Sequence, residues 1–147
     1  MRTKRLYTIG YEGKTTEGLV AVLTGNKVAL IVDVRAVPNS RNNGFSKSRL
    51  SAVLSRNGIG DVHIRELGTP KYLRARLKAN KDFAGFKNGY RRQLDFIPDV
   101  LKDLAEMVVN KDCCLLCLVE YYADCHRSIL ADEVVERFHL PLTIKHL

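Results

Sequence analysis

The sequence predicts an α/β fold, a three-layer sandwich in which a mainly parallel, Rossmann-like sheet lies between two layers of helices. Apolar runs at 28–34 and 113–119 do not alternate with polar residues, as is typical of strands covered on both faces. Segments with helical periodicity separate these runs from the other strand-like segments, an order that favours parallel pairing. The length of 147 residues suits a single domain over residues 1–147.

The first half of the chain alternates strands with helices. The segment 5–10 reads as a strand that ends at glycine, and 15–26 as a helix with a threonine start and a Gly-Asn stop. The buried strand at 28–34 precedes a short helix at 46–58, which begins at serine and ends at Asn-Gly. The segment 61–67 alternates apolar and polar residues, which predicts a less buried strand.

The second half of the chain contains more helix. Thr69 and Pro70 are typical of a cap and a first helical residue, which predicts a helix at 69–80. Apolar residues at spacings of three and four predict a helical stretch over 90–108, in which Pro98 starts a new helix or kinks the first one. The remaining predicted elements are the buried strand at 113–119, a helix capped by Asp124 that extends to Phe138, and a last strand at 141–147.

Composition excludes several classes of protein. The chain is 46% hydrophobic and 27% charged, as is typical of a soluble globular protein. It has no apolar run near the roughly 20 residues of a membrane span, and its start lacks the apolar core of a signal peptide. Its four cysteines resemble no disulfide framework, which agrees with a reducing compartment. We therefore expect a cytoplasmic protein that has no membrane partner.

Positive charge is concentrated in the middle of the chain. Between Arg35 and Arg92 there are fourteen Lys and Arg residues against three Asp and Glu residues, and the whole chain has a formal charge of +8. Nine of the fourteen are arginines, whose guanidinium groups match phosphate oxygens. This pattern predicts a polyanion partner, either nucleic acid or a nucleotide, and a solvated lysine-rich face is the alternative.

Polar residues follow three of the predicted strands and should meet in space. Right-handed crossovers place the loops after the strands at 5–10, 28–34 and 113–119 along one edge of the sheet. Ligands of such sheets bind beyond the carboxyl ends of the strands. The three loops contain the sequences GYEG, DVRAVPNSRNNGFSK and EYYADCHR. The sequence therefore predicts a functional site at this edge.

The same loops carry a resemblance to a known family. The motifs TIGYEG, VDVRAVPNSRNNGFSK and LLCLVEYYADCHR occur in this order, with ELGTP in the middle, over most of the chain from Tyr7 to His146. In order and separation they resemble the domain of unknown function family numbered 488. The resemblance supports the fold and the location of the site, and it implies no particular activity. One departure is that Glu120 follows Cys117 by three positions, where the family commonly has two.

Donors that suit a phosphate group come mainly from the second loop. Its serine and basic side chains surround Gly44, which permits close approach of a backbone. An arginine in the first turn of a helix opposes the helix dipole, so Arg127 predicts a local anion or carboxylate partner. The alternative is a lattice in which Arg35 pairs with Glu12 or Glu120 and pins the loops together. The predicted substrate- or phosphate-binding residues are Tyr11, Arg35, Ser40, Arg41, Lys47 and Arg127.

Three carboxylates, Glu12, Asp33 and Glu120, come from the three loops. Carboxylates beside arginines are the ingredients of general acid–base chemistry and of Mg²⁺-assisted phosphoryl transfer. A divalent metal ion is therefore the one cofactor that the sequence suggests. A network of buried ion pairs uses the same residues and is the more common arrangement.

The segment DCHRS places a cysteine at the start of a predicted helix. With Asp124 as the cap, Cys125 takes the first helical position, where free N–H groups and the helix dipole favour a thiolate. His126 adds positive charge, which predicts a nucleophilic or redox-sensitive thiol. The alternative is that Cys125 packs inward as a small apolar group. A structural zinc site at Cys125 and His126 is less favoured, because the chain has no paired C-x-x-C knuckles.

Together these features predict an enzyme, of a hydrolase or nuclease-like kind, that binds a phosphate-bearing substrate at the sheet edge. One alternative is a non-catalytic nucleic-acid-binding module, and another is a cysteine-dependent small-molecule enzyme. The sequence specifies neither the oligomeric state nor a choice between DNA and RNA. The predicted catalytic residues are Glu12, Asp33, Glu120, Cys125 and His126.

Overall fold

The computed structural model describes residues 4–38, 44–121 and 125–147, which contain a five-stranded sheet. Each pair of neighbouring strands is parallel, and the strand order is β3-β2-β4-β1-β5. This confirms the predicted α/β fold with a Rossmann-like parallel sheet. The strands are β1 (Arg5–Gly10), β2 (Leu30–Asp33), β3 (Gly60–His63), β4 (Cys113–Cys117) and β5 (Thr143–His146).

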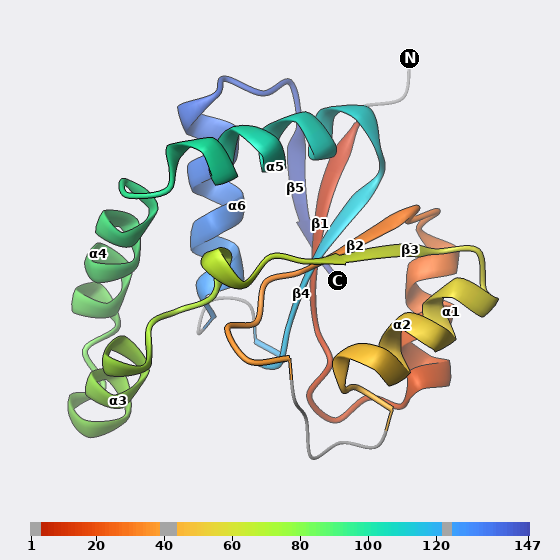
Figure 1. Cartoon of the computed structure of the whole chain (residues 1–147), viewed down its shortest axis with the longest axis horizontal. Coiled ribbons are helices and arrows are strands. Elements are labelled where there is room, and N and C mark those ends of the chain that lie inside the picture. The colour runs from red at the N-terminus through yellow and green to blue at the C-terminus, as the bar shows by residue number, and fades with distance from the viewer. Residues whose placement is uncertain (1–3, 39–43, 122–124) are drawn as a thin grey trace.

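Helices cover both faces of the sheet. Figure 1 shows α1 and α2 on one side of the strands and α3 to α6 on the other, so the molecule has the three expected layers. Within the described residues, every helix is too short or too polar to cross a membrane. The helices are α1 (Thr16–Gly25), α2 (Lys47–Arg56), α3 (Lys71–Asn80), α4 (Phe83–Leu94), α5 (Pro98–Asn110) and α6 (His126–Arg137).

The apolar core consists of two clusters, one on each face of the sheet. All five residues of β4 are buried, which explains why its sequence does not alternate. Because successive side chains of a strand point to opposite faces, Cys114 and Leu116 pack toward α1 and α2. Cys113, Leu115 and Cys117 pack toward the layer of α3 to α6. This alternation determines on which side of the sheet the last cysteine of β4 lies.

The segment predicted as a strand at 61–67 differs from the prediction in its second half. The strand β3 ends at His63, and a short 3₁₀ helix, η1, follows at Arg65–Leu67. After it, Gly68 lies so close to the loop after β2 that an added Cβ would be 2.3 Å from the backbone nitrogen of Ala36. The chain therefore turns toward β2, which buries Leu67 completely.

Most helix boundaries lie within two residues of the predictions, but α4 starts at Phe83, seven residues before the predicted helical stretch at 90–108. Pro98 starts α5, which confirms one of the two predicted alternatives. The helix α3 starts one residue later than predicted, after Pro70. The helix α6 starts at His126 with Cys125 in the N-cap position, and the predicted cap, Asp124, lies outside the described residues.

The strand order produces a switch point between β1 and β4. The connection from β1 leads past β4 to β2, whereas the connection from β4 leads past β1 to β5. Two neighbouring strands whose connections leave in opposite directions leave a crevice at their carboxyl ends, where ligands bind in such folds. The loop after β1 runs alongside the loop after β4. Tyr11 N–H donates to the Cys117 carbonyl, and Glu12 N–H donates to the Leu118 carbonyl. The three predicted loops thus meet at one edge.

Candidate functional site

A pocket of about 410 Å³ lies at the carboxyl ends of the central strands and extends to α3 and α4. Two exposed cations of α3, Arg74 and Lys78, contribute to its lining. Its buried part includes Cys117, Cys125 and His126. Much of the remaining lining is apolar and comes from Val37, Leu77, Phe86, Leu118 and Val119.

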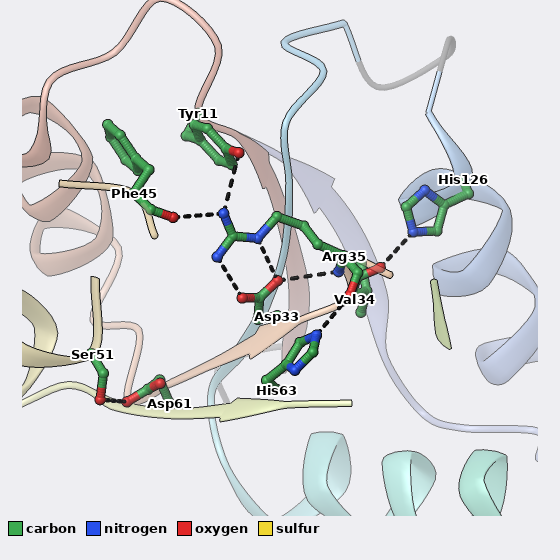
Figure 2. Close-up of polar contacts among 9 residues, drawn as sticks. All are labelled: Tyr11, Asp33, Val34, Arg35, Phe45, Ser51, Asp61, His63 and His126. Atoms are coloured by element: carbon green, nitrogen blue, oxygen red, sulfur yellow. Dashed lines mark hydrogen bonds and ion pairs between the residues drawn. The ribbon is translucent and has the colours of Figure 1, made fainter. Parts of the chain in front are cut away.

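One side of the pocket is built on a buried ion pair between Asp33 and Arg35. Arg35 Nε donates to Asp33 Oδ1 at 2.8 Å, and Nη2 contacts Oδ2 at 2.7 Å. Arg35 Nη1 also donates to the Phe45 carbonyl at 2.6 Å and to the Tyr11 hydroxyl at 3.2 Å, as Figure 2 shows. The rings of Tyr11 and Phe45 stack with their centroids 4.5 Å apart. One guanidinium group therefore joins β2 to the loops before α1 and α2.

The electrostatics of Arg35 follow from this arrangement. Only 5% of the residue is exposed, and burial by itself lowers the pKa of a guanidinium group. The hydrogen bonds and negative charge of Asp33 outweigh burial and raise the pKa of Arg35. The ion-pair lattice that the sequence predicts as an alternative is present here, but the partner of Arg35 is Asp33 instead of Glu12 or Glu120.

Cys117, Cys125 and His126 form a compact group at the buried part of the pocket. The Sγ atoms of both cysteines lie 3.7 Å from His126 Nδ1. The other ring nitrogen, Nε2, lies 2.7 Å from the Val34 carbonyl oxygen at the end of β2. Because a carbonyl only accepts hydrogen bonds, Nε2 carries a proton, and Nδ1 faces the two sulfur atoms. Figure 2 shows the His126 ring directed at this carbonyl.

The two cysteines of this group differ in their acidity. The hydrogen bond with Cys117 lowers the pKa of Cys125 to about 4; burial opposes this shift, and His126 adds to it. The same hydrogen bond, together with burial, raises the pKa of Cys117. Burial raises the pKa of Cys113 to about 11 and also raises that of Cys114. Cys125 is therefore the acidic thiol of the four.

Arg127 is completely buried, and its side chain binds the backbone of the loop after β4. Its guanidinium group donates to the carbonyl oxygens of Val119 and Glu120, and its Nε donates to the Thr8 hydroxyl of β1 at 3.2 Å. The expected anion or carboxylate partner is thus replaced by backbone carbonyls. These bonds hold the loop after β4 against β1 and so position the segment between Cys117 and Cys125.

The three predicted carboxylates do not gather at one point. Asp33 is paired with Arg35, whereas Glu12 and Glu120 are exposed. Glu12 Oε1 accepts a hydrogen bond from the Glu120 backbone N–H at 3.3 Å. Within the described residues, only Cys117, Cys125 and His126 place three metal-ligating atoms within 4.8 Å of one another. Glu12, Asp33 and Glu120 therefore do not form the group of carboxylates that was expected for a metal site.

The remaining predicted residues lie apart from this group. Lys47 is exposed in the first turn of α2, on the opposite face of the sheet from α6. Ser40 and Arg41 fall outside the described residues. Tyr11 is buried, lines the pocket and holds Arg35. Of the predicted residues, the structure thus brings Tyr11, Asp33 and Arg35 together at one side of the pocket, and Cys125 and His126 at another.

Sequence reasoning missed Cys117, Arg74 and Lys78 as lining residues. Cys117 reads as one more apolar residue of a buried strand, but it is the last residue of that strand. Its position at the carboxyl end of a strand could have indicated that it lines a ligand site. The two cations belong to a helix that follows β3, and nothing in the local sequence indicates that this helix approaches the loops of β2 and β4.

Fold and site together define a parallel α/β domain with a Cys-Cys-His group in a pocket at the switch point of its sheet. A family model described as domain of unknown function DUF488 matches residues 15–134. The chain therefore belongs to this family, in agreement with the motif resemblance. No curated protein and no solved structure matches the chain.

Proposed function

We propose that this domain is a cysteine-dependent enzyme that acts on a small molecule carrying a phosphate group, such as a nucleotide. The observation that carries the proposal is the composition of the pocket. It unites a Cys-Cys-His group with the cations Arg74 and Lys78 at the switch point of a parallel sheet. Positions of this kind are where parallel α/β proteins bind their ligands.

The size and lining of the pocket support a small substrate. A volume of about 410 Å³ falls in the range of roughly 300–1,000 Å³ that is typical of small-molecule sites. Such sites combine an apolar lining with a few polar groups that orient the ligand. Phe86 and Leu77 offer an apolar surface for a flat or aliphatic body, while the cysteines and His126 supply the reactive atoms.

The charges around the pocket support an anionic group on the substrate. Arg74 and Lys78 are one helical turn apart, so they lie on the same face of α3. Arg74 Nη1 donates a hydrogen bond to the Thr69 carbonyl at 2.7 Å. This bond holds the guanidinium group of Arg74 near the pocket. Among the described residues that line the pocket, none is Asp or Glu. Phosphate is the common small anion that such a pair of cations recognises.

Removal of the two pocket cations is expected to weaken the binding of phosphorylated compounds. We predict that a panel of inorganic phosphate, nucleotides and sugar phosphates contains a compound that raises the melting temperature of the wild-type protein. In the Arg74→Gln/Lys78→Gln variant, its dissociation constant should rise at least about tenfold, because two charge-assisted contacts are lost. Thermal shift and calorimetry measure both effects.

A charge-matched variant provides the control. Lys71→Gln/Arg76→Gln removes the same charge from the same helix, and neither residue lines this pocket. Its dissociation constant should stay within about twofold of the wild-type value. Equal weakening in both variants would contradict a bound phosphate in the pocket. For a compound that is turned over, Cys125→Ser should abolish turnover, and Cys114→Ser should retain it.

A second candidate function, binding of nucleic acid without catalysis, is favoured by the surface of α3. Its sequence, KYLRARLKAN, has four basic residues and no acidic one, and all four basic residues are exposed. A polyanion lying along this helix would displace several counterions, so its affinity would fall steeply with salt.

Retention of a single-stranded oligonucleotide distinguishes the two functions. If α3 binds a polyanion, affinity should fall at least about tenfold between 50 and 200 mM salt. Both double variants of α3 should then weaken binding to a similar degree, and Cys125→Ser should not. If only the pocket variant loses affinity, the small-molecule function is supported and the nucleic-acid function is contradicted. Filter binding at several salt concentrations measures this difference.

A further inference from the structure

We infer that Cys117, Cys125 and His126 form a Cys₂His site for Zn²⁺, with a fourth coordination position open to the pocket. The inference deepens the proposed function, since it rests on the same pocket and gives its reaction centre a chemical identity. Metal binding itself needs no substrate, so it is testable separately from the binding of phosphorylated compounds.

The separations of the three ligand atoms match a zinc site. Typical bond lengths are about 2.3 Å for Zn–S and about 2.0 Å for Zn–N, and tetrahedral angles then place S and N roughly 3.5 Å apart. The distances from His126 Nδ1 to the sulfur atoms of Cys117 and Cys125 are both 3.7 Å. All three atoms lie within 4.8 Å of one another. A metal ion could therefore enter with little movement of the side chains.

The orientation of His126 is the second observation. A histidine that binds a metal through one ring nitrogen almost always donates a hydrogen bond from the other, which fixes the ring and its tautomer. Here Nε2 donates to the Val34 carbonyl oxygen at 2.7 Å, and Nδ1 is left to face the two sulfur atoms. The Tyr90 ring packs edge-on against the imidazole with centroids 5.3 Å apart. The imidazole is thus already held in a ligating orientation.

The three ligands come from regular structure. Cys117 is the last residue of β4, and Cys125 and His126 are the N-cap and first residue of α6. All three are at most 7% exposed, yet all three line the pocket. Ligands on a strand end and a helix start hold their geometry better than ligands within a long loop.

The donor set selects the kind of metal and its role. Two thiolates and one imidazole suit Zn²⁺, whereas Mg²⁺ prefers carboxylate and water oxygens. Two thiolates and a neutral imidazole also cancel the charge of the ion, which suits a largely buried site. A site with three protein ligands is typical of catalytic zinc, whose fourth position takes water or substrate. Zinc there would polarise a substrate oxygen.

Metal content and cobalt spectra test the inference. The wild-type protein, produced in zinc-supplemented medium, should contain about one zinc ion per chain, as measured by inductively coupled plasma mass spectrometry. The chelator-treated protein, titrated with Co²⁺, should show the visible bands of tetrahedral cobalt and a sulfur-to-cobalt charge-transfer band. The cobalt titration uses the unaltered chain, so its result does not depend on how a variant folds.

The four cysteines supply matched variants for this test. Cys117→Ser and Cys125→Ser should weaken zinc affinity by more than the roughly 10- to 100-fold that is typical of second-shell changes. Cys114→Ser, in the same strand but on the opposite face, should bind zinc like the wild type. Competition with a chromophoric chelator measures each affinity.

Several results would overturn the inference. Zinc well below one per chain after titration of the wild-type protein would do so, as would cobalt bands without sulfur charge transfer. Equal loss of affinity in Cys114→Ser would place the metal elsewhere. A disulfide between Cys117 and Cys125, seen as a loss of two hydrogens in the intact mass under non-reducing conditions that reductant reverses, would replace the metal site with a redox pair. In each case the effect of Arg74→Gln/Lys78→Gln on phosphorylated compounds still decides the proposed function.

Discussion

Asp33→Ala is expected to lower the free energy of unfolding by about 3–5 kcal/mol. The variant removes the carboxylate that holds two of the guanidinium nitrogens of Arg35, while the charge of Arg35 stays buried. An unpaired buried charge is much more costly than the loss of the whole pair. Urea denaturation at neutral pH measures the change.

Asp61→Ala is the matched control for this prediction. Asp61 lies on β3, where it pairs with Ile31 of the neighbouring strand β2, and it is half-buried. It accepts a hydrogen bond from the Ser51 hydroxyl at 2.8 Å, also drawn in Figure 2, so its removal should cost about 1 kcal/mol. The double variant Asp33→Leu/Arg35→Met should recover part of the stability lost in Asp33→Ala. If Asp33→Ala cost no more than Asp61→Ala, the ion pair would not be a main support of this edge.

Gly10→Ala is expected to cost about 3 kcal/mol or more and to disturb the cysteine site. A Cβ on Gly10 would be 1.8 Å from the carbonyl oxygen of Val119 and 2.4 Å from its carbonyl carbon. Both atoms belong to the backbone, so the loop after β4 would have to move away from β1. That movement breaks the hydrogen bond from Arg127 to Val119 and shifts the segment that follows Cys117. Urea denaturation measures the stability change, and zinc affinity measures the effect on the site.

Gly25→Ala is the corresponding control. Gly25 is the last residue of α1, and an added Cβ there would meet nothing within 4 Å. Alanine has a higher helix propensity than glycine, so this variant should be neutral or more stable by up to about 1 kcal/mol. A loss of stability as large as that of Gly10→Ala would mean that the close approach at Val119 is not the cause.

The fold was predictable from the sequence because its strongest signals are local. The apolar runs at 28–34 and 113–119 are buried strands in the structure, although each strand is shorter than its run. The order of elements then required parallel strands and one edge for the three loops. The end of β3 was not predictable in this way, because the 3₁₀ helix at Arg65–Leu67 is followed by Gly68, which packs against the loop after β2, a contact distant in sequence.

The site was predictable in location but not in its pairings. The predicted partners of Arg35 in an ion-pair lattice were Glu12 and Glu120, yet its partner is Asp33, two residues earlier. Residues two apart on an extended chain point to the same side, so this signal was present in the motif Asp-Val-Arg. The approach of Cys117 to His126 depends instead on how α6 packs against β4. The local sequence pattern does not predict this packing.

The position of β4 has a consequence for how the chain acquires its fold during synthesis. β4 lies between β1 and β2, although both of those strands precede it in the sequence. A ribosome releases β1 and β2 long before the strand that joins them, and in the meantime their inner edges have no backbone to pair with. We expect nascent chains that end before residue 113 to remain open to proteases and chaperones, and β1 and β2 to be joined in one sheet only after β4 has been synthesised.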